Sequence, residues 1–500
     1  MKIKRIMALA MAVLMIVALV GCGKNTRERI ELTLSTEDAE AILRAAGIWL
    51  PDAEQAAGAN TTLTWYANYD FYAYASDEMS QLGFFTFKER YGGDVEWWEF
   101  PSWETRFDQL ANYILAGTPP DFTQSDTALF PMKALRGVIQ PVDDYIDYDD
   151  PLWADVKDYA KNYFALNDKT YMFVTDMTFD LVVPYNPRVI NEWGFDDPAE
   201  LYYNDDWTWD EFYEMCFDFT DQDADQYALD GWYFSRAIMM STGVTLVGYD
   251  VESGDFFSNV DDPRLERAAN LLYEISRNEL IYPWWNGWSL RNGTDGGGMK
   301  EGLCLFHPIG AWGFTSGGYE AVTNVWGDAA DGEIMFVPVP RDPNGDGNYY
   351  MSATAAGYFL VNGSVHPEGV ALLAMCDRFK AIDPTVVGID RYQYEHTMHW
   401  SQEMLDMYDE CKRLAVSGVG NIVIKYGDDD KAGYGSKVGG MLRYFSDDIG
   451  HPTSAAGANT WAQTKEAYGD TFQYMIDELN KSVDEFIANG MKAETSAAND

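Results

Sequence analysis

Short amide and carboxylate side chains follow two segments that we expect to be β-strands. They are Asn68 and Asp70 on either side of Tyr69 after the first strand, and Gln124 and Asp126 on either side of the hydroxyl residue Ser125 after the third. Amide and carboxylate groups provide the donors and acceptors that hydroxyl groups require, so these residues suit a hydroxyl-rich, uncharged ligand. For Asp70 and Asp126, a loop cap or Asx-turn explains the residue type equally well.

The elements that position these residues alternate between strand and helix. Residues 63–66 read as a first strand, 79–91 as a helix ending before Gly92, and 95–100 as a second strand. A second helix, with Ser102 as its N-cap, ends at Gly117, and P-P-D-F (119–122) leads into a third strand. This order predicts an α/β fold with mostly parallel sheets, in which ligands bind beyond the carboxyl ends of the strands.

No motif in the chain requires enzymatic chemistry. T-W-D-E (208–211) is a capping box that opens a helix, so Asp210 and Glu211 are helix-start charges rather than a catalytic pair. G-x-S-x-G and G-x-x-x-x-G-K-[ST] are both absent, and the chain has 5 histidines. A secreted glycoside hydrolase stays open as an alternative, since a pair of carboxylates can always be found among 80 acidic residues.

Two stretches resemble metal sites only superficially. D-P-N-G-D-G-N (342–348) imitates the start of a calcium loop, but Ala353 stands where a bidentate glutamate belongs, which favours a polar hairpin tip. Glu395, His396 and His399 have helical spacing but no evident third ligand. We therefore expect no metal and no cofactor.

The first 22 residues have the pattern of an export signal. Lys2, Lys4 and Arg5 precede the uncharged stretch 6–20, which is too short for a membrane span. L-V-G-C (19–22) resembles the lipobox of bacterial lipoproteins, which implies a signal peptide over 1–21 and a diacylglyceryl group on Cys22. We expect residues 22–60 to be the anchor and tether, with one helix over 36–50, and the protein to be extracytoplasmic and lipid-anchored to the cell membrane. An ordinary secretory signal is the alternative.

Composition limits the ligand. The net charge of -45 argues against nucleic acid, anionic lipid and anionic solutes as partners, and so favours a neutral solute. Seventeen tryptophans and 32 tyrosines fit a carbohydrate site or a tyrosine-rich surface. Apart from Cys22, the cysteines are widely spaced and have apolar neighbours, so buried free thiols are expected, although a disulfide stays open. They are Cys216, Cys304, Cys376 and Cys411.

A series of segments, in order, resembles the extracellular solute-binding proteins of ABC importers, specifically the sugar-binding group that includes maltose-binding protein. The segments are A-G-T-P-P-D-F (116–122), G-V-I-Q-P-V-D-D-Y-I-D (137–147), N-D-K-T-Y-M-F-V (167–174), V-P-Y-N-P (183–187), D-D-W-T-W-D-E-F (205–212), M-K-E-G-L-C-L-F-H-P-I-G-A-W (299–312), I-M-F-V-P-V-P (334–340) and S-V-H-P-E-G-V-A-L-L (364–373). The resemblance covers about residues 61–490.

This resemblance implies a periplasmic-binding-protein fold with two α/β lobes and three chain crossings. The crossings fall near 174–180, 351–356 and within 384–396. The N-terminal lobe then comprises 61–176 and 353–395, the C-terminal lobe 177–352 and 396–490, and 491–500 form a flexible tail. By the same resemblance, further ligand contacts are expected at Asp176, Trp232, Phe234, Trp312 and Trp461.

The implied function is transport rather than catalysis. The protein would capture a neutral carbohydrate, most simply an oligosaccharide, between lobes that close around it. The implied partners are the carbohydrate, the permease subunits of the ABC transporter and the membrane, with the protein itself a monomer. The sequence leaves the identity of the sugar and of the permease open.

Overall fold

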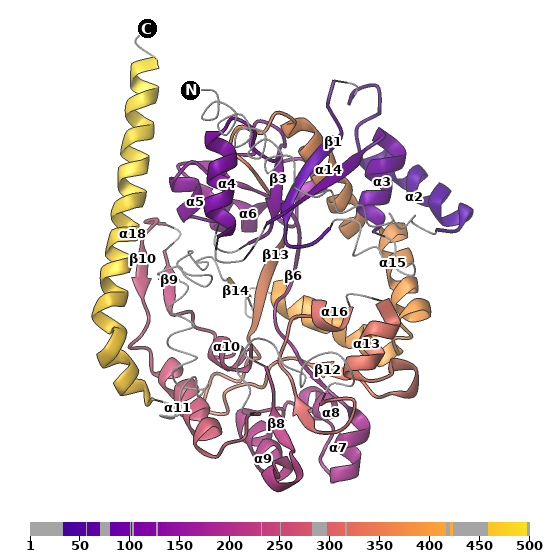
Figure 1. The fold of residues 1–500 in the computed structure, drawn as a ribbon, viewed down its shortest axis with the longest axis vertical. Helices are drawn as coiled ribbons and strands as arrows, with labels where there is room; N and C mark the ends of the chain where they lie inside the picture. The colour runs from indigo at the N-terminus through magenta and orange to yellow at the C-terminus, as the bar shows by residue number, and fades with distance from the viewer. Residues whose placement is uncertain are drawn as a thin grey trace, which may run out of the picture. The chain divides into compact units, whose positions relative to one another are not determined.

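Two long strands, β6 (Met172–Phe179) and β13 (Met351–Leu360), run antiparallel through the middle of the fold (Figure 1). In the computed structural model they belong to a six-stranded sheet with β1 (Thr62–Ala67), β2 (Asp94–Glu99), β3 (Phe122–Gln124) and β14 (Asn421–Val423). β1 is parallel to both β2 and β3, as predicted. Because β13 is antiparallel to β3 and β6, the complete sheet is mixed.

The structure describes residues 34–56, 58–70, 81–100, 102, 105–126, 129–231, 233–250, 252–282, 298–315, 318–416, 421–423 and 459–497. These residues all lie in one compact unit, Leu32–Asp500. The predicted signal peptide and the lipidation site Cys22 lie outside the described residues. Among the helices that are described, none is both long and apolar enough to cross a bilayer.

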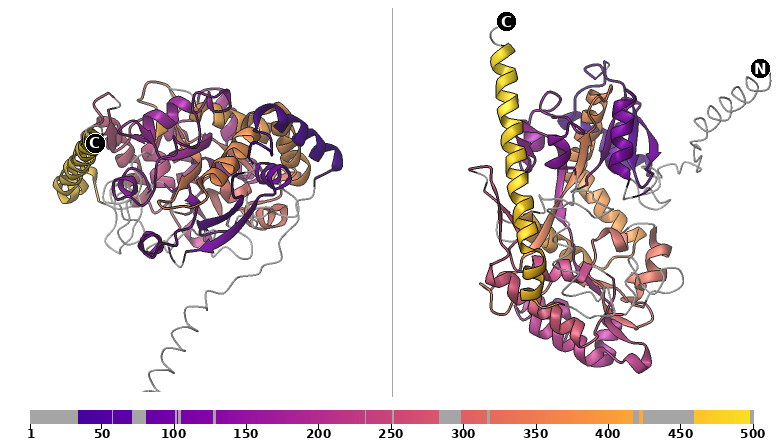
Figure 2. Two further views of the ribbon diagram at one scale, coloured as in Figure 1. Left: turned by 90° about the horizontal axis from the view of Figure 1, so that it is seen from above. Right: turned by 60° about the vertical axis from the view of Figure 1, so that its left-hand side comes forward.

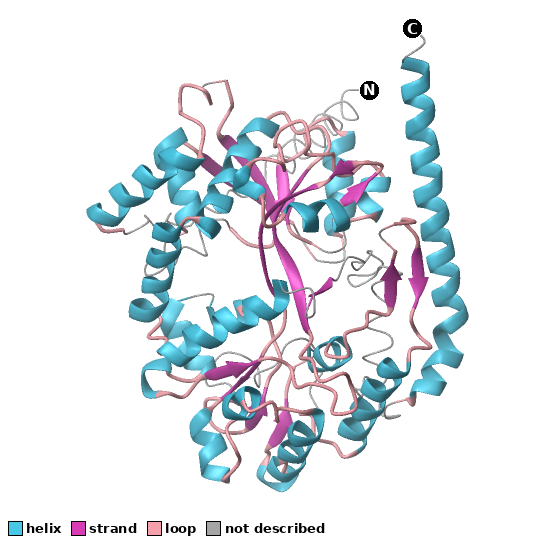
Figure 3. Cartoon of the chain, turned by 180° about the vertical axis from the view of Figure 1, so that it is seen from behind, coloured by secondary structure: helices cyan, strands magenta, loops and turns pink. Residues whose placement is uncertain are grey.

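Helices flank the sheet of the N-terminal lobe (Figure 3). They are α2 (Thr36–Trp49), α3 (Leu82–Tyr91), α4 (Arg106–Leu115), α5 (Met132–Leu135), η1 (Pro151–Trp153), α6 (Lys157–Tyr163), α14 (Pro367–Ile382) and α15 (Pro384–Thr397), with a small hairpin of β4 (Ala165–Leu166) and β5 (Lys169–Thr170). The prediction for α3 is confirmed, since Gly92 caps it in the left-handed conformation at φ 65°. The predicted helix over 36–50 is confirmed as α2, which packs on α3, α14 and α15.

The predicted start of α4 is wrong by several residues. The helix begins at Arg106 with Thr105 in the cap position, and no side chain caps it. Ser102 Oγ instead accepts a hydrogen bond from the main-chain N–H of Thr105 at 3.2 Å. Because the serine oxygen serves this preceding turn, Ser102 is not the N-cap.

The C-terminal lobe contains three two-stranded sheets. β8 (Tyr227–Leu229) is parallel to β11 (Cys304–Phe306), whereas β7 (Val183–Tyr185) with β12 (Met335–Val337), and β9 (Val247–Tyr249) with β10 (Phe256–Ser258), are antiparallel. The helices are α7 (Pro187–Trp193), α8 (Pro198–Tyr203), α9 (Trp209–Phe219), η2 (Gln222–Ala224), α10 (Tyr233–Met240), α11 (Pro263–Arg277), α12 (Trp312–Thr315), α13 (Gly318–Trp326), η3 (Ala329–Asp331) and α16 (Gln402–Val416). The predicted cap of α9 is confirmed, because Thr208 Oγ1 accepts the N–H of Glu211 at 3.4 Å. Trp207 and Trp209 are buried beside it.

The first two predicted crossings fall on β6 and β13, and the predicted lobe boundaries stay a prediction. At the third predicted crossing the chain forms α15, and α16 then packs on β6, β13 and β12. Tyr202 of α8 donates a hydrogen bond to Glu410 of α16 at 2.5 Å, which ties α16 to the C-terminal lobe. Strand β14, which the sequence analysis missed, pairs with the first residues of β13.

The last described element, α18 (Trp461–Ala497), is a helix of 37 residues. It runs beside β10 in both views of Figure 2 and packs on β10 and α11 of the C-terminal lobe and on α5 of the N-terminal lobe. Its buried side chains form one stripe at helical spacing: Trp461, Thr464, Phe472, Ile476, Leu479 and Val483. This helix therefore joins the two lobes away from the β6–β13 crossing.

The four cysteines within the described residues are buried free thiols, which confirms the expectation from their apolar neighbours. Burial raises the pKa of the thiols of Cys216, Cys376 and Cys411 well above the ordinary value. These groups are therefore protonated at neutral pH and have a packing role.

Candidate ligand-binding site

The carboxyl end of β3 presents the first group of predicted ligand residues. Gln124 is 9% exposed, and its Oε1 has no hydrogen-bond partner among the described residues. Ser125 Oγ donates a hydrogen bond to the carbonyl oxygen of Ala355 at 2.9 Å, so the end of β3 is tied to the hinge strand β13. Gln124 thus offers an acceptor next to the chain crossing.

Asp126 is held by an ion pair. Arg106 Nε lies 2.8 Å from Asp126 Oδ2, and both side chains are at most 10% exposed. The guanidinium of Arg106 also stacks on the ring of Phe107 at 4.1 Å from its centroid. The carboxylate of Asp126 therefore anchors α4 to the end of β3, which is a structural task that the sequence analysis did not anticipate.

The turn after β1 carries Asn68 and Asp70. Asn68 is exposed and Asp70 is partly buried. Between them, the carbonyl oxygen of Tyr69 accepts the indole N–H of the buried Trp65 at 3.2 Å, and the two rings meet edge to face. This contact fixes the turn at the carboxyl end of β1, one strand away from Gln124.

Asp176 lies on the hinge strand, and its carboxylate is engaged by charged side chains. Lys412 of α16 donates to its Oδ2 at 2.6 Å, and Arg378 Nη1 of α14 lies 4.0 Å from its Oδ1. Arg378 is completely buried and also donates to the carbonyl oxygens of Thr175 and Leu152. These contacts favour a hinge role for Asp176, and ligand contact by this residue stays a prediction.

Among the predicted aromatic contacts that the structure describes, Trp312 is the accessible one. It begins α12 and is 48% exposed. Its indole lies over Gly310, where a Cβ atom would be 2.4 Å from Trp312 Nε1 and 2.9 Å from the carbonyl oxygen of Asp180. Gly310 therefore allows the ring to lie close to the end of the β6 crossing.

An ion pair beside Trp312 was missed by the sequence analysis. Arg236 of α10 donates from Nη2 to Asp180 Oδ2 at 2.5 Å, while its buried Nε has no partner in the part of the chain that the structure describes. Asp180 follows β6 directly, and Arg236 stands two residues after the predicted contact Phe234. The sequence could have indicated Asp180 and Arg236 as candidate site residues from these positions. That the two side chains form an ion pair is seen only in the folded structure.

Two other predicted aromatic contacts are enclosed. Phe234 is 0% and Trp461 is 2% exposed, and both belong to the hydrophobic core. Their burial favours packing over ligand contact. Trp232 lies outside the described residues.

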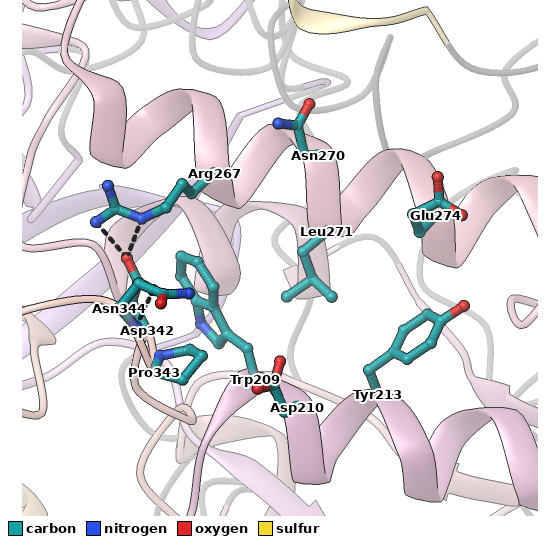
Figure 4. A pocket seen from close by; sticks show the side chains of 10 residues that line it. All are labelled: Trp209, Asp210, Tyr213, Arg267, Asn270, Leu271, Glu274, Asp342, Pro343 and Asn344. Carbon is teal, nitrogen blue, oxygen red and sulfur yellow. Dashed lines mark hydrogen bonds and ion pairs between the residues drawn. The ribbon is translucent and has the colours of Figure 1, made fainter.

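A pocket of about 470 Å³ opens elsewhere in the C-terminal lobe, between α9 and α11 (Figure 4). Its lining residues are Trp209, Asp210, Tyr213, Arg267, Asn270, Leu271, Glu274, Asp342, Pro343 and Asn344. Arg267 Nη2 pairs with Asp342 Oδ2 at 2.6 Å, so the first residue of the calcium-like motif is neutralised by a cation. Within the described residues, no group of three or more His, Cys, Asp or Glu side chains could hold a metal ion.

A family comparison identifies the chain. The model of the family described as "Bacterial extracellular solute-binding protein" matches residues 66–375, more than half of the chain. The chain belongs to this family. No curated protein sequence shows significant similarity to this solute-binding protein.

Solved structures share the two-lobed fold of this solute-binding protein. The GacH receptor of Streptomyces glaucescens, solved unliganded and with acarbose, is 16% identical with a TM-score of 0.56, covering 82% of this chain and 98% of its own. The galacto-N-biose-/lacto-N-biose I-binding protein of Bifidobacterium longum, solved with lacto-N-biose, is 14% identical with a TM-score of 0.56. The match covers 84% of this chain and 97% of that protein. The maltose-maltodextrin binding protein of Alicyclobacillus acidocaldarius is 15% identical with a TM-score of 0.54, and the match covers 82% of this chain and 100% of that protein. The predicted family and fold class are confirmed.

Proposed function

We propose that this solute-binding protein captures a neutral carbohydrate between its lobes and delivers it to the permease of an ABC transporter. The observation that carries this proposal is the family match over residues 66–375. The similar structures named above were solved with, or named for, saccharides or an acarbose ligand, which supports a carbohydrate as the ligand class. The net charge of -45 also favours an uncharged solute.

The proposed site lies along the β6–β13 crossing. From the N-terminal lobe it uses Gln124 and the turn that carries Asn68 and Asp70. From the C-terminal lobe it uses Trp312, whose exposed indole suits the C–H face of a sugar ring, and the pair formed by Asp180 and Arg236. Both charges of that pair are matched, so the site suits hydroxyl groups rather than an ionic ligand.

Closure would follow from the ligand touching both lobes. A ligand shifts a conformational balance only through its difference in affinity for the two states. Moving the balance from 1:99 to 99:1 takes about 5.5 kcal/mol. Hydrogen bonds on one lobe together with stacking and hydrogen bonds on the other would supply this difference.

We place the protein outside the cytoplasm, attached to the cell membrane through lipid on Cys22, as a monomer that needs no cofactor. We also propose that it has no enzymatic activity. Mass spectrometry of the protein purified from membranes tests the lipid, and release of products from glycans over hours by purified protein would favour the hydrolase alternative.

A thermal-shift screen of the full chain against a glycan panel tests the ligand class. A ligand that binds only the folded protein stabilises it by RT ln(1 + [L]/Kd), so a tight ligand at millimolar concentration raises the melting temperature by several degrees. Small-angle scattering with and without the best glycan then tests closure. The proposal fails if no neutral saccharide or polyol raises the melting temperature.

A further inference from the structure

Two neighbouring strands of the C-terminal lobe end at buried polar residues. β8 and β11 are parallel, and Leu229 is in register with Phe306. Asp230 and His307 therefore follow at the same edge, and they are 1% and 0% exposed. Because ligands of α/β proteins bind at the carboxyl ends of parallel strands, this edge is where the C-terminal lobe is expected to meet its ligand.

His307 carries hydrogen-bonding groups that the described structure does not use. Both of its ring nitrogens, Nδ1 and Nε2, are buried without a hydrogen-bond partner among the described residues. Burial lowers the pKa of this histidine to about 3, so the ring is neutral at physiological pH. A neutral imidazole has one donor and one acceptor, the same pair that a hydroxyl group has. An unused pair of this kind in a protein interior requires an explanation.

The packing around the ring brings it against the main chain of a turn. Gly231 has φ +78°, and a Cβ atom there would lie 2.6 Å from Cε1 and 2.7 Å from Nε2 of His307. Glycine is thus required above the ring. Trp326 meets the ring edge to face at 5.3 Å, but its indole N–H donates to Gly313 and so does not serve His307.

We infer that His307 is a specificity residue of the C-terminal half of the ligand site, and that its imidazole exchanges hydrogen bonds with a ligand hydroxyl group when the lobes close. This inference rests on the proposed function, because it requires a hydroxyl-rich ligand. Gln124 Oε1, at the end of β3 in the other lobe, is likewise buried without a partner among the residues that the structure describes. Buried atoms without a partner also occur at other described residues, such as Thr464 on α18, so the position of His307 matters as much as its burial.

The competing explanation is a buried water molecule that bridges the ring to its surroundings. Variants of the full chain, purified in detergent, distinguish the two. Isothermal titration uses the glycan that gives the largest thermal shift with the wild-type protein. We expect His307→Leu to bind it at least ten-fold more weakly, and His307→Gln, which keeps a donor and an acceptor, to recover most of the loss. The control His396→Gln changes a histidine whose side chain is 49% exposed, and it should bind like the wild type.

Nuclear magnetic resonance of the His307 ring nitrogens in the wild-type protein is a second test, which does not depend on whether His307→Leu folds. The protein is labelled with ¹⁵N-histidine, and His307 is assigned by its absence from the His307→Gln spectrum. Addition of the glycan should shift both His307 ring resonances. Glycan affinity of His307→Leu within two-fold of wild type, or ring resonances unmoved by bound glycan, overturns the inference alone. A wild-type protein that binds no glycan overturns the proposed function and this inference with it.

Discussion

Lys412 Nζ lies 2.6 Å from Asp176 Oδ2, and this ion pair joins α16 to the hinge strand β6. On the other side of the same carboxylate, Arg378 Nη1 of α14 approaches to 4.0 Å. Asp176 is thus in contact with cations from both lobes at the point where the chain crosses between them. The arrangement couples the position of each lobe to one side chain.

The Asp176–Lys412 pair should contribute measurably to stability because it is partly shielded from solvent. The side chains are 28% and 33% exposed. A double-mutant cycle with Asp176→Asn and Lys412→Met should give a coupling of about 1 kcal/mol in urea unfolding. As a matched control, the Lys465–Asp261 pair has an aspartate that is 90% exposed, so its coupling should be near zero. Equal couplings would contradict the hinge role of Asp176.

Stability should fall with acid partly because of His307. The pKa of His307 is about 3 in the folded protein and 6.5 in its ordinary state. Between these pH values the unfolded chain is protonated at His307, whereas the folded protein is not. The contribution is complete above pH 6.5 and is lost as the pH falls towards 3, at about 1.4 kcal/mol per pH unit. The difference in unfolding free energy between wild type and His307→Gln should therefore change with this slope between pH 6.5 and 4. A difference that stays flat would show that the ring protonates normally.

Trp312 and Trp461 should respond differently to replacement by alanine. Trp312 is 48% exposed, so Trp312→Ala should lower glycan affinity at least ten-fold with a change in unfolding free energy under about 1 kcal/mol. Trp461 is 2% exposed, so Trp461→Ala should cost about 3–5 kcal/mol of stability. Chemical denaturation and titration of both variants check this. A destabilised Trp312→Ala with normal affinity would remove this ring from the site.

Gly357 should be intolerant of any side chain. It has φ +144° at the bulge between β13 and β6, and a Cβ atom would lie 1.8 Å from the carbonyl oxygen of Phe173. Gly357→Ala should cost about 3 kcal/mol or more, because main-chain atoms of the hinge must move. Gly388, on α15 with nothing within 4 Å of an added Cβ, is the control, and Gly388→Ala should stabilise the protein by about 0.5–1 kcal/mol. Equal effects in thermal unfolding would contradict this geometry.

Asn480 should stabilise the attachment of α18 to the C-terminal lobe. Its amide accepts the main-chain N–H of Phe256 at 2.8 Å and donates to the carbonyl oxygen of the same residue at 2.9 Å, so it acts as a partner for the edge of β10. Asn480→Ala should cost about 1–3 kcal/mol in denaturant unfolding. Gln473→Ala on the exposed face of α18 should change stability by less than about 0.5 kcal/mol. A neutral Asn480→Ala would show that the apolar stripe alone holds the helix.

Local patterns in the chain predicted the elements that depend on neighbouring residues. The left-handed Gly92 ends α3, and Thr208 caps α9, because both effects involve atoms within one helical turn. Burial of the four cysteines followed from their apolar neighbours. Ser102 was misassigned since a serine before a helix fits both a cap and a preceding turn.

Pairings between distant residues depended on the folded chain. Asp176 finds Lys412 across 236 positions, and Asp180 finds Arg236 across 56, so no periodicity or spacing relates the partners. Residue type left Asp126 open between a ligand and a loop cap and favoured a ligand contact for Trp461, whereas the fold places Asp126 against Arg106 and Trp461 in the core. Helix ends depend on hydrogen bonds between residues close in the sequence, so the sequence predicts them. Contacts between distant residues form only when sheets and helices bury their apolar faces against one another.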